Sequence, residues 1–177
     1  MGRVYLDYNA SAPLLEPAKK AMIEAFDVFG NGSSVHNQGR EVHGRIEAAR
    51  EALANMVGAR AQDVIFTSGG TEANNLALTP SLFPKDMQSQ ARLYVSGIEH
   101  PSVLNGMRFE KNKITVIPVT REGVVDVEWL RSELLSTEEA VDETNKNEPN
   151  KKQIKPLLVS VMAANNETGI VQPIAEI

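Results

Sequence analysis

The residues best suited to chemistry lie in "DVIFTSGGTEANNLAL", Asp63 to Leu78, where two glycines separate a β-branched run from residues of helical character. The run Val64 to Thr67 predicts a buried strand, and Gly69 and Gly70 predict a turn into a helix that starts near Thr71. The first N–H groups of a helix have no partners within it, and glycines let an anion approach them closely. The junction therefore suits a phosphate, with the Thr71 hydroxyl as a further donor.

The same residues have a second interpretation. Gly-Gly-Thr is also a common tight connection between a strand and a helix, in which Thr71 would serve as the N-cap. The stretch is not a Walker-type nucleotide loop, because no Gly-Lys-Ser/Thr follows. It is not a dinucleotide-binding loop either, because the glycine spacing does not fit that fingerprint. Taken alone, these residues leave the phosphate site and the plain turn equally open.

A second polar group is His100 in "SGIEHPSVLNG", Ser96 to Gly106, just after a predicted strand and just before a predicted helix. In an open α/β sheet such positions lie at the carboxyl ends of the strands, where ligands bind. His100 and the Gly70-Thr71 turn should therefore share one rim. An isolated histidine is more often an ordinary hydrogen-bonded residue, so only the position of His100 at the end of a strand favours a functional role.

The third group is "SVMAANNETG", Ser160 to Gly169, in which an apolar strand ends in two asparagines, a glutamate and a threonine. Such residues either satisfy a turn or contact a polar ligand, and asparagine-rich turns are common. Three polar strand ends directed to one rim are harder to dismiss than any one of them alone.

Apolar periodicity predicts two helices before these groups. The first runs from Leu14 to Phe29 and stops at Gly30, and the second runs from Val42 to Met56 and stops at Gly58. The residues between them, 30–39, are dense in turn formers and predict an exposed loop.

After Gly58 the pattern changes to an alternation of short strands and helices, which predicts the α/β class, with a largely parallel sheet and helices on its faces. The expected strands are 64–66, 93–95, 114–119 and 157–163, and the expected helices lie around Ala73, around Val103 and over 125–135. Residues 136–155 are polar and contain Pro149, so we expect a solvated surface insertion. The chain then stops just after Pro173, which suits the first turn of another helix, so the fold looks interrupted.

Composition narrows the function classes. The 177 residues are 42% hydrophobic and 23% charged, enough for a globular core. A formal charge of −5 disfavours nucleic acid and anionic membranes as partners and favours a small molecule. The absence of cysteine excludes disulfides, thiolate nucleophiles and cysteine metal sites in this chain, and no metal site is expected. The N-terminus has neither an apolar signal region nor a myristoylation pattern, so we expect a cytoplasmic protein.

Five ordered stretches resemble the N-terminal portion of the cysteine desulfurases of the NifS and IscS type, close kin of selenocysteine lyases within the class V aminotransferase family. They are "YLDYNASAP" at 5–13, "GNGSSVHNQGR" at 30–40, "FTSGGTEANNLAL" at 66–78, "EHPSVL" at 99–104 and "NNETGIVQPI" at 165–174. The resemblance implies a pyridoxal 5′-phosphate (PLP) enzyme of fold type I, similar to aspartate aminotransferase. Residues 1–13 would then be an arm on the substrate side, and residues 14–177 part of the large cofactor-binding domain.

The resemblance also implies roles for particular residues. Gly70 and Thr71 match the residues that receive the cofactor phosphate, and His100 matches the histidine that stacks over the pyridine ring. Asn166 matches the asparagine beside the ring and its phenolic oxygen. Asn9 and Ala10 are the nearest matches on the substrate side of the cleft.

The chemistry that the resemblance implies needs parts that this chain does not contain. PLP chemistry needs a lysine that binds the cofactor and an acid that keeps the pyridine nitrogen protonated. The family supplies them from "D-A-x-Q" and "S-x-H-K" strands, which have no match here, and desulfuration also needs a cysteine. We therefore expect this chain alone to be inactive, and to be marginally stable unless it pairs with itself or with a second fragment.

The leading hypothesis is thus the N-terminal part of an enzyme that removes sulfur from L-cysteine, giving L-alanine and a persulfide for iron-sulfur cluster or thiolation pathways. Its partners would be a second copy of the chain and a sulfur-acceptor or scaffold protein. One alternative is selenocysteine lyase or another class V enzyme. Another is a non-catalytic product of a split gene that acts as a dimerisation or interaction module.

Overall fold

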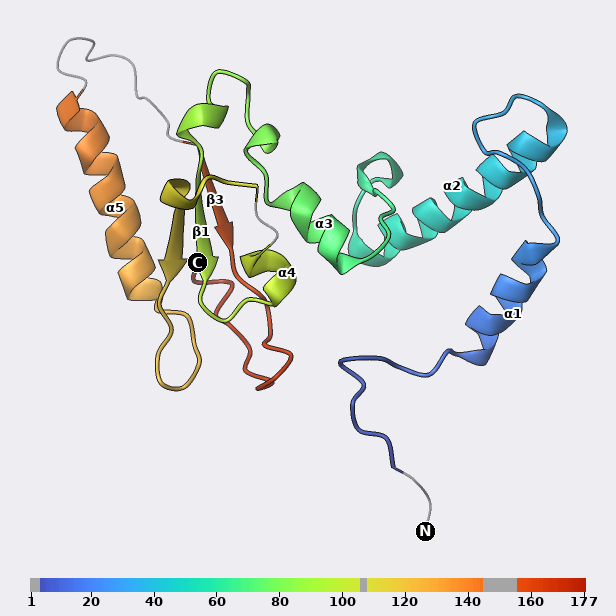
Figure 1. Cartoon of the computed structure of the whole chain (residues 1–177), viewed down its shortest axis with the longest axis horizontal. Coiled ribbons are helices and arrows are strands. Elements are labelled where there is room, and N and C mark those ends of the chain that lie inside the picture. Colours follow the sequence, from blue (N-terminus) through green and yellow to red (C-terminus); the bar gives the residue numbers. More distant parts are fainter. Residues whose placement is uncertain (1–3, 106–107, 145–155) are drawn as a thin grey trace. The chain divides into compact units, whose positions relative to one another are not determined.

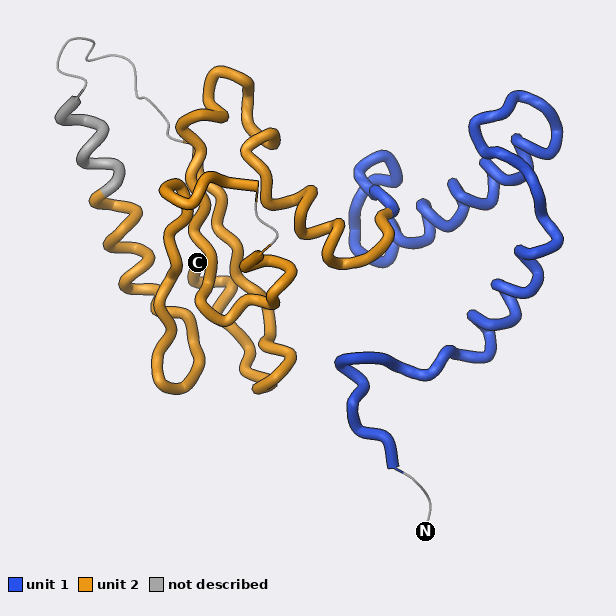
Figure 2. Tube along the Cα trace, viewed as in Figure 1, with its two compact units in different colours: residues 1–66 blue, residues 67–177 orange. Residues whose placement is uncertain are grey.

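The computed structural model describes residues 4–105, 108–144 and 156–177, the side chains of 137–144 excepted. The chain forms two compact units, residues 1–66 and residues 67–177, coloured separately in Figure 2. Each unit is described by itself below.

The first unit is helical and contains α1 (Glu16–Phe26), α2 (Asn37–Val57) and a short 3₁₀ turn, η1 (Ala61–Asp63). The imidazole of His36 caps the start of α2 by accepting the Gly39 N–H, and α2 ends at Gly58. Gly58 has a φ of 68°, in the left-handed region that glycine tolerates best, so the predicted helix stop is confirmed.

The predicted stop of the first helix at Gly30 is wrong. Helix α1 ends at Phe26 and is capped by Asp27, and the Val28 N–H donates to the Ala25 carbonyl in a tight closing turn. No residue of α1 is buried, so packing does not hold a further turn against this local alternative.

The predicted buried strand at Val64 to Thr67 is also not formed. The backbone at Val64 is extended, but its carbonyl accepts from the Arg50 guanidinium at 2.5 Å, and Ile65 is 75% exposed. The Arg50 guanidinium carbon also lies 4.9 Å from the centre of the Phe66 ring. An extended run becomes a strand only when a neighbouring strand forms a ladder of backbone hydrogen bonds with it. Here the Val64 carbonyl is bonded to the Arg50 side chain and not to another strand.

The second unit is built on a parallel sheet of order β2-β1-β3 (Figure 1). Its strands are β1 (Arg92–Ser96), β2 (Ile114–Ile117) and β3 (Leu157–Ser160), and its α-helices are α3 (Gly70–Ala77), α4 (Pro101–Leu104) and α5 (Val127–Thr144). Short 3₁₀ turns η2 (Pro80–Leu82), η3 (Gln88–Gln90) and η4 (Lys111–Lys113) connect them. Three of the four predicted strands and the α/β class are thus confirmed.

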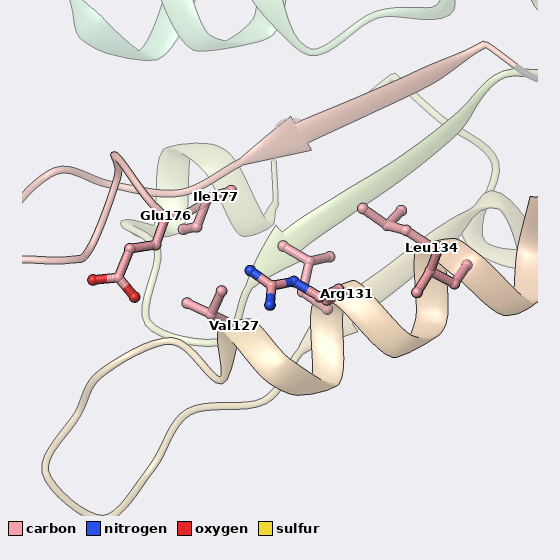
Figure 3. Close-up of a pocket in the computed structure, with 7 residues that line it drawn as sticks. Val127, Arg131, Leu134, Glu176 and Ile177 are labelled. Atoms are coloured by element: carbon pink, nitrogen blue, oxygen red, sulfur yellow. The ribbon is translucent and has the colours of Figure 1, made fainter.

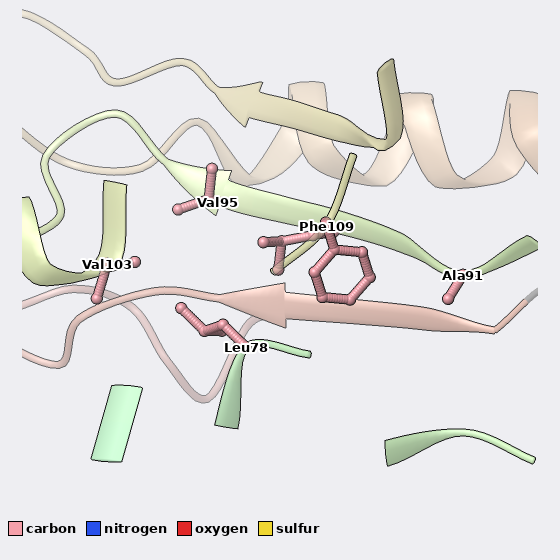
Figure 4. Packing of buried hydrophobic residues seen from close by; sticks show 6 residues of the cluster. Leu78, Ala91, Val95, Val103 and Phe109 are labelled. Atoms are coloured by element: carbon pink, nitrogen blue, oxygen red, sulfur yellow. The ribbon is translucent and has the colours of Figure 1, made fainter. Parts of the chain in front are cut away.

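Strand β1 is central and buried on both faces, as its uninterrupted apolar run requires. Leu93 and Val95 face one cluster with Leu78, Ala91, Val103 and Phe109 (Figure 4). Tyr94 faces a second cluster with Ile117, Val125 and Leu130. This alternation fixes the register of the strand that leads to His100.

The expected surface insertion begins as a helix. Helix α5 starts after Asp126, whose carboxylate accepts the Trp129 N–H at 2.9 Å, and it continues to Thr144, well into residues 136–155. The rest of that segment, 145–155, lies outside the described residues.

Candidate functional site

Helix α3 begins with open backbone donors. Gly69 occupies the N-cap position, so Thr71 is inside the helix and is not the cap. The first amide bonded within the turn is that of Ala73, which donates to the Gly69 carbonyl at 3.1 Å, so the N–H groups of Gly70 and Thr71 precede the helical ladder. A Cβ added at Gly69 or Gly70 would meet nothing within 4 Å. The exposed Thr71 and these amides form a donor set that fits a phosphate.

Glu72 fixes the loop in front of these donors. Its carboxylate accepts the Ser68 N–H at 2.7 Å, and hydrogen bonds from the Ser68 backbone and side chain hold the pKa of Glu72 below its ordinary value of 4.5. The ionised carboxylate takes the Ser68 amide and leaves those of Gly70 and Thr71 for a ligand.

His100 lies where the sequence predicts, between β1 and α4, and its side chain is exposed. It caps α4: its Nδ1 accepts the Ser102 N–H at 3.0 Å and lies 2.8 Å from the Ser102 Oγ. The same Oγ accepts from the Asn74 Nδ2 at 2.9 Å. Since Asn74 lies one turn after Gly70, this contact ties the start of α3 to the histidine.

The residue before the histidine, Glu99, is a positioning group that sequence reasoning missed. It is 8% exposed, and one of its carboxylate oxygens accepts from the Ser96 hydroxyl at 2.7 Å and from the Met162 N–H at 2.6 Å. This carboxylate therefore joins the carboxyl ends of β1 and β3. The available signal is a charged residue three positions after the end of an apolar strand, which becomes informative only once the neighbouring strand is known.

The asparagine pair divides into two roles. Asn165 satisfies the turn, because its Oδ1 accepts the N–H groups of Glu167 and Thr168, both at 2.9 Å, while its Nδ2 donates to the Ile98 carbonyl at 3.1 Å. Asn166 is exposed, and its amide donates to the Glu167 carboxylate at 3.2 Å. The structural interpretation of an asparagine-rich turn thus holds for Asn165, and Asn166 is the member that faces solvent.

Gln172 is a second residue that sequence reasoning missed. It is 4% exposed, and its amide accepts the Val125 N–H at 2.8 Å and donates to the Gly123 carbonyl at 3.0 Å. Residues 119–125 form a hairpin closed by an antiparallel bridge between Val119 and Val125. The stretch "NNETGIVQPI" therefore contains an anchor to this hairpin as well as a candidate ligand residue.

The two arm residues, Asn9 and Ala10, belong to the first unit, where they are exposed in a turn. The Tyr5 hydroxyl donates to the carbonyls of Asp7 and Ser11 and so closes this turn. A role for Asn9 and Ala10 on the substrate side stays a prediction.

A separate cavity of about 170 Å³ lies between α5 and the last residues of the chain (Figure 3). Its lining is mainly apolar, with Val127, Leu130 and Leu134 among the side chains, and it includes none of the predicted site residues. The candidate site is thus the rim at the carboxyl ends of β1 and β3.

Over the residues that the structure describes, no three His, Asp or Glu side chains are grouped closely enough to hold a metal ion. Among the described helices, none combines the length and the apolar character that crossing a membrane requires.

The α/β fold matches solved structures of NifS-like proteins, so its class is that of the PLP-dependent transferases. The sequence matches the family described as Aminotransferase class-V over residues 4–177, and the chain belongs to this family. The predicted resemblance and fold class are confirmed.

Named relatives agree with this assignment. The chain is 38% identical to a cysteine desulfurase IscS of Dictyoglomus turgidum, across 98% of this chain and 40% of the relative. It is 34% identical to a human selenocysteine lyase, across 99% of this chain and 40% of that protein. The structure of a NifS-like protein from Rickettsia africae matches with a TM-score of 0.74 at 32% identity, across 98% of this chain and 43% of that one. The chain thus spans about 40% of the length of these curated relatives.

Proposed function

We propose that this chain is the N-terminal part of a PLP-dependent cysteine desulfurase. The whole enzyme would remove sulfur from L-cysteine and give L-alanine and a protein-bound persulfide for iron-sulfur cluster or thiolation pathways. The proposal rests on the family match over residues 4–177 and on the relatives named as cysteine desulfurases.

One observation of the structure carries the cofactor part of the proposal. Asn74, one turn after the open amides at the start of α3, is joined through Ser102 to His100, which supports placing the phosphate donors and the imidazole in one site. The Gly70 and Thr71 amides and the Thr71 hydroxyl would hold the phosphate. His100 would lie against the pyridine ring, and Asn166 would contact its phenolic oxygen.

Bound PLP supplies an electron sink, which stabilises the carbanion that forms on an amino acid substrate. The residues of this chain would bind and orient the group and present imidazole and amide donors to it. The lysine, the acid and the cysteine that desulfuration needs would come from outside this chain, which contains no cysteine. We therefore expect no alanine release from L-cysteine by this chain alone.

Binding of the phosphate can be tested without a lysine. We would titrate the ¹⁵N-labelled chain with pyridoxamine 5′-phosphate, which forms no imine with lysine side chains, and use pyridoxamine as the control that lacks the phosphate. Saturable shifts of the Gly70 and Thr71 amides with the phosphate ester alone would support the proposal. Equal responses to both compounds, or no response to either, would contradict the phosphate site.

A second candidate is selenocysteine lyase, favoured by the 34% identity to the human protein of that name. The two activities differ in the chalcogen that leaves the substrate. Fusing this chain to the remainder of the Dictyoglomus turgidum relative would allow release of alanine from L-cysteine and L-selenocysteine to be compared. A His100→Ala fusion is the control, since it should be inactive with both substrates.

A further inference from the structure

A side chain of α3 is linked to His100 through a serine of α4, the helix that His100 caps. Asn74 in α3 donates to the Ser102 Oγ at 2.9 Å, and this Oγ lies 2.8 Å from the His100 Nδ1. The Ser102 N–H donates to the same Nδ1 at 3.0 Å. The single lone pair of Nδ1 thus faces two groups of Ser102, its backbone N–H and its hydroxyl, and the hydroxyl is itself held by Asn74.

The direction of these hydrogen bonds follows from what each group can do. A backbone N–H only donates, so the His100 Nδ1 must offer its lone pair, and the proton of the neutral ring must be on Nε2. The Ser102 hydroxyl has one hydrogen. Because its oxygen already accepts from the Asn74 amide, that hydrogen is available for Nδ1.

We propose that Ser102 and Asn74 are positioning residues that hold His100 in its Nε2–H tautomer and fix the orientation of its ring. The inference deepens the proposed function, on which its meaning rests: the edge of the ring left for a ligand is an N–H donor. Ser102 is partly buried, and Asn74 joins it to the same helix that offers the phosphate donors.

The chain contains a natural comparison in His36. Its Nδ1 also accepts a backbone N–H at a helix start, from Gly39 at 3.2 Å. The donor residue there is a glycine, so no hydroxyl on it can add a second contact. A role in capping therefore does not require the serine and asparagine, which points to a purpose for them at His100.

The tautomer can be read directly. Long-range ¹H–¹⁵N correlation spectra of histidine-labelled chain, recorded at about pH 8 where the ordinary imidazole is neutral, distinguish a protonated from an unprotonated Nδ1. The three histidines are assigned with His36→Gln and His43→Gln variants. We expect His100 to be wholly in the Nε2–H form, and a protonated Nδ1 would overturn the proposal.

Variants then isolate the two side chains. Ser102→Ala keeps the backbone N–H on Nδ1 but loses the hydroxyl, so a minor Nδ1–H population should appear beside the Nε2–H form, whereas Ser102→Thr, which keeps the hydroxyl, should retain the single form. Asn74→Asp replaces the donor by an acceptor that competes for the serine hydrogen, so it should act like Ser102→Ala. Asn75→Asp is the matched control, because Asn75 donates to the Thr71 carbonyl and not to Ser102. An unchanged His100 in both Ser102→Ala and Asn74→Asp would overturn the proposal.

The readout separates this inference from the proposed function, because the tautomer is measured without any ligand. In addition, Ser102→Ala should weaken pyridoxamine 5′-phosphate binding by roughly two- to tenfold, the value of one net hydrogen bond, with Ser102→Thr close to wild type. Absence of binding by the wild-type chain would contradict the proposed function and leave the tautomer result standing. A fixed tautomer with no effect of Ser102→Ala on a measurable affinity would contradict the link between the two.

Discussion

Thr71 is the residue at which the proposed phosphate binding can be tested without disturbing the helix. Thr71→Val keeps the β-branched shape and removes only the hydroxyl, which is exposed in the first turn of α3. A hydrogen bond to a charged group contributes about 1.5–3 kcal/mol, so we expect affinity for pyridoxamine 5′-phosphate to fall by roughly tenfold or more. Isothermal titration calorimetry measures this affinity. Thr115→Val on β2 is the control, because it makes the same substitution away from the proposed site. An unchanged Thr71→Val would exclude the hydroxyl from the site.

Glu99 is expected to be the most costly single polar residue at the rim. Glu99→Ala would leave the Met162 N–H and the Ser96 hydroxyl without their acceptor. Unpaired buried donors cost about 1–3 kcal/mol each, so we expect a loss of about 3 kcal/mol in the free energy of unfolding. Glu99→Gln keeps one oxygen for both donors and should lose about 1 kcal/mol. Urea denaturation measures both, and equal losses would contradict the single-oxygen clamp.

The charge of Glu72 makes the start of α3 sensitive to acid. Its folded pKa is lowered by the hydrogen bonds from Ser68, so the stabilisation is present above the ordinary value of 4.5 and is lost as the pH falls through the lower folded pKa. The Ser68 amide proton shift should follow this titration with a midpoint below 4.5. Glu72→Gln should abolish the titration, and Glu122→Gln, which removes a carboxylate bonded to Thr120, should leave it intact.

At the scale of elements, α2 allows the effect of a glycine at the helix end to be compared with that of a glycine in the helix interior. Gly58 caps the helix with a φ of 68°, and Gly44 lies in its interior; an added Cβ meets nothing within 4 Å at either position. Gly58→Ala should therefore destabilise by about 1 kcal/mol through backbone strain alone. Gly44→Ala should stabilise by about 0.5–1 kcal/mol. Thermal unfolding followed by far-ultraviolet circular dichroism measures both, and shifts of the same sign would refute this account.

Periodicity predicted the elements whose ends are decided locally. The stop of α2 at Gly58 needed only a left-handed residue, and β1 followed from an apolar run that is buried on both faces. The run 64–67 has the composition of a strand, but whether it forms one depends on a neighbouring strand, which local composition does not identify. Gly30 failed as a helix stop because α1 buries nothing and ends in a local turn first.

The candidate site could be predicted in its positions but not in its connections. Glycines before a helix and a histidine after a strand are local signals, so the sequence alone indicates Gly70, Thr71 and His100 as candidates. The contacts that position these residues, such as Asn74 to Ser102 and Glu99 to Met162, join residues far apart in the sequence. Their partners emerge only from the order of the strands.

At the scale of the whole molecule, large apolar side chains remain exposed in both units. Phe26 is 79% exposed and Phe29 76% in the first unit, and Val116 is 56% exposed in the second. Such surface favours association, in line with the proposed pairing of the chain with a second copy. Sedimentation velocity should show an average mass that rises with concentration. A monomer at every concentration, with no binding of a hydrophobic dye, would contradict this prediction.

The position of β1 between β2 and β3 also has a consequence for biosynthesis. The pairing of Leu93 with Ile114 closes a short connection, whereas its pairing with Leu158 closes a much longer one. A chain leaving the ribosome can therefore form the β1-β2 pair early and must carry the other edge of β1 open until residues 157–160 emerge. During that interval the exposed edge is a template for strands of other nascent chains, so the order of synthesis makes this edge the point at which a chaperone would matter most.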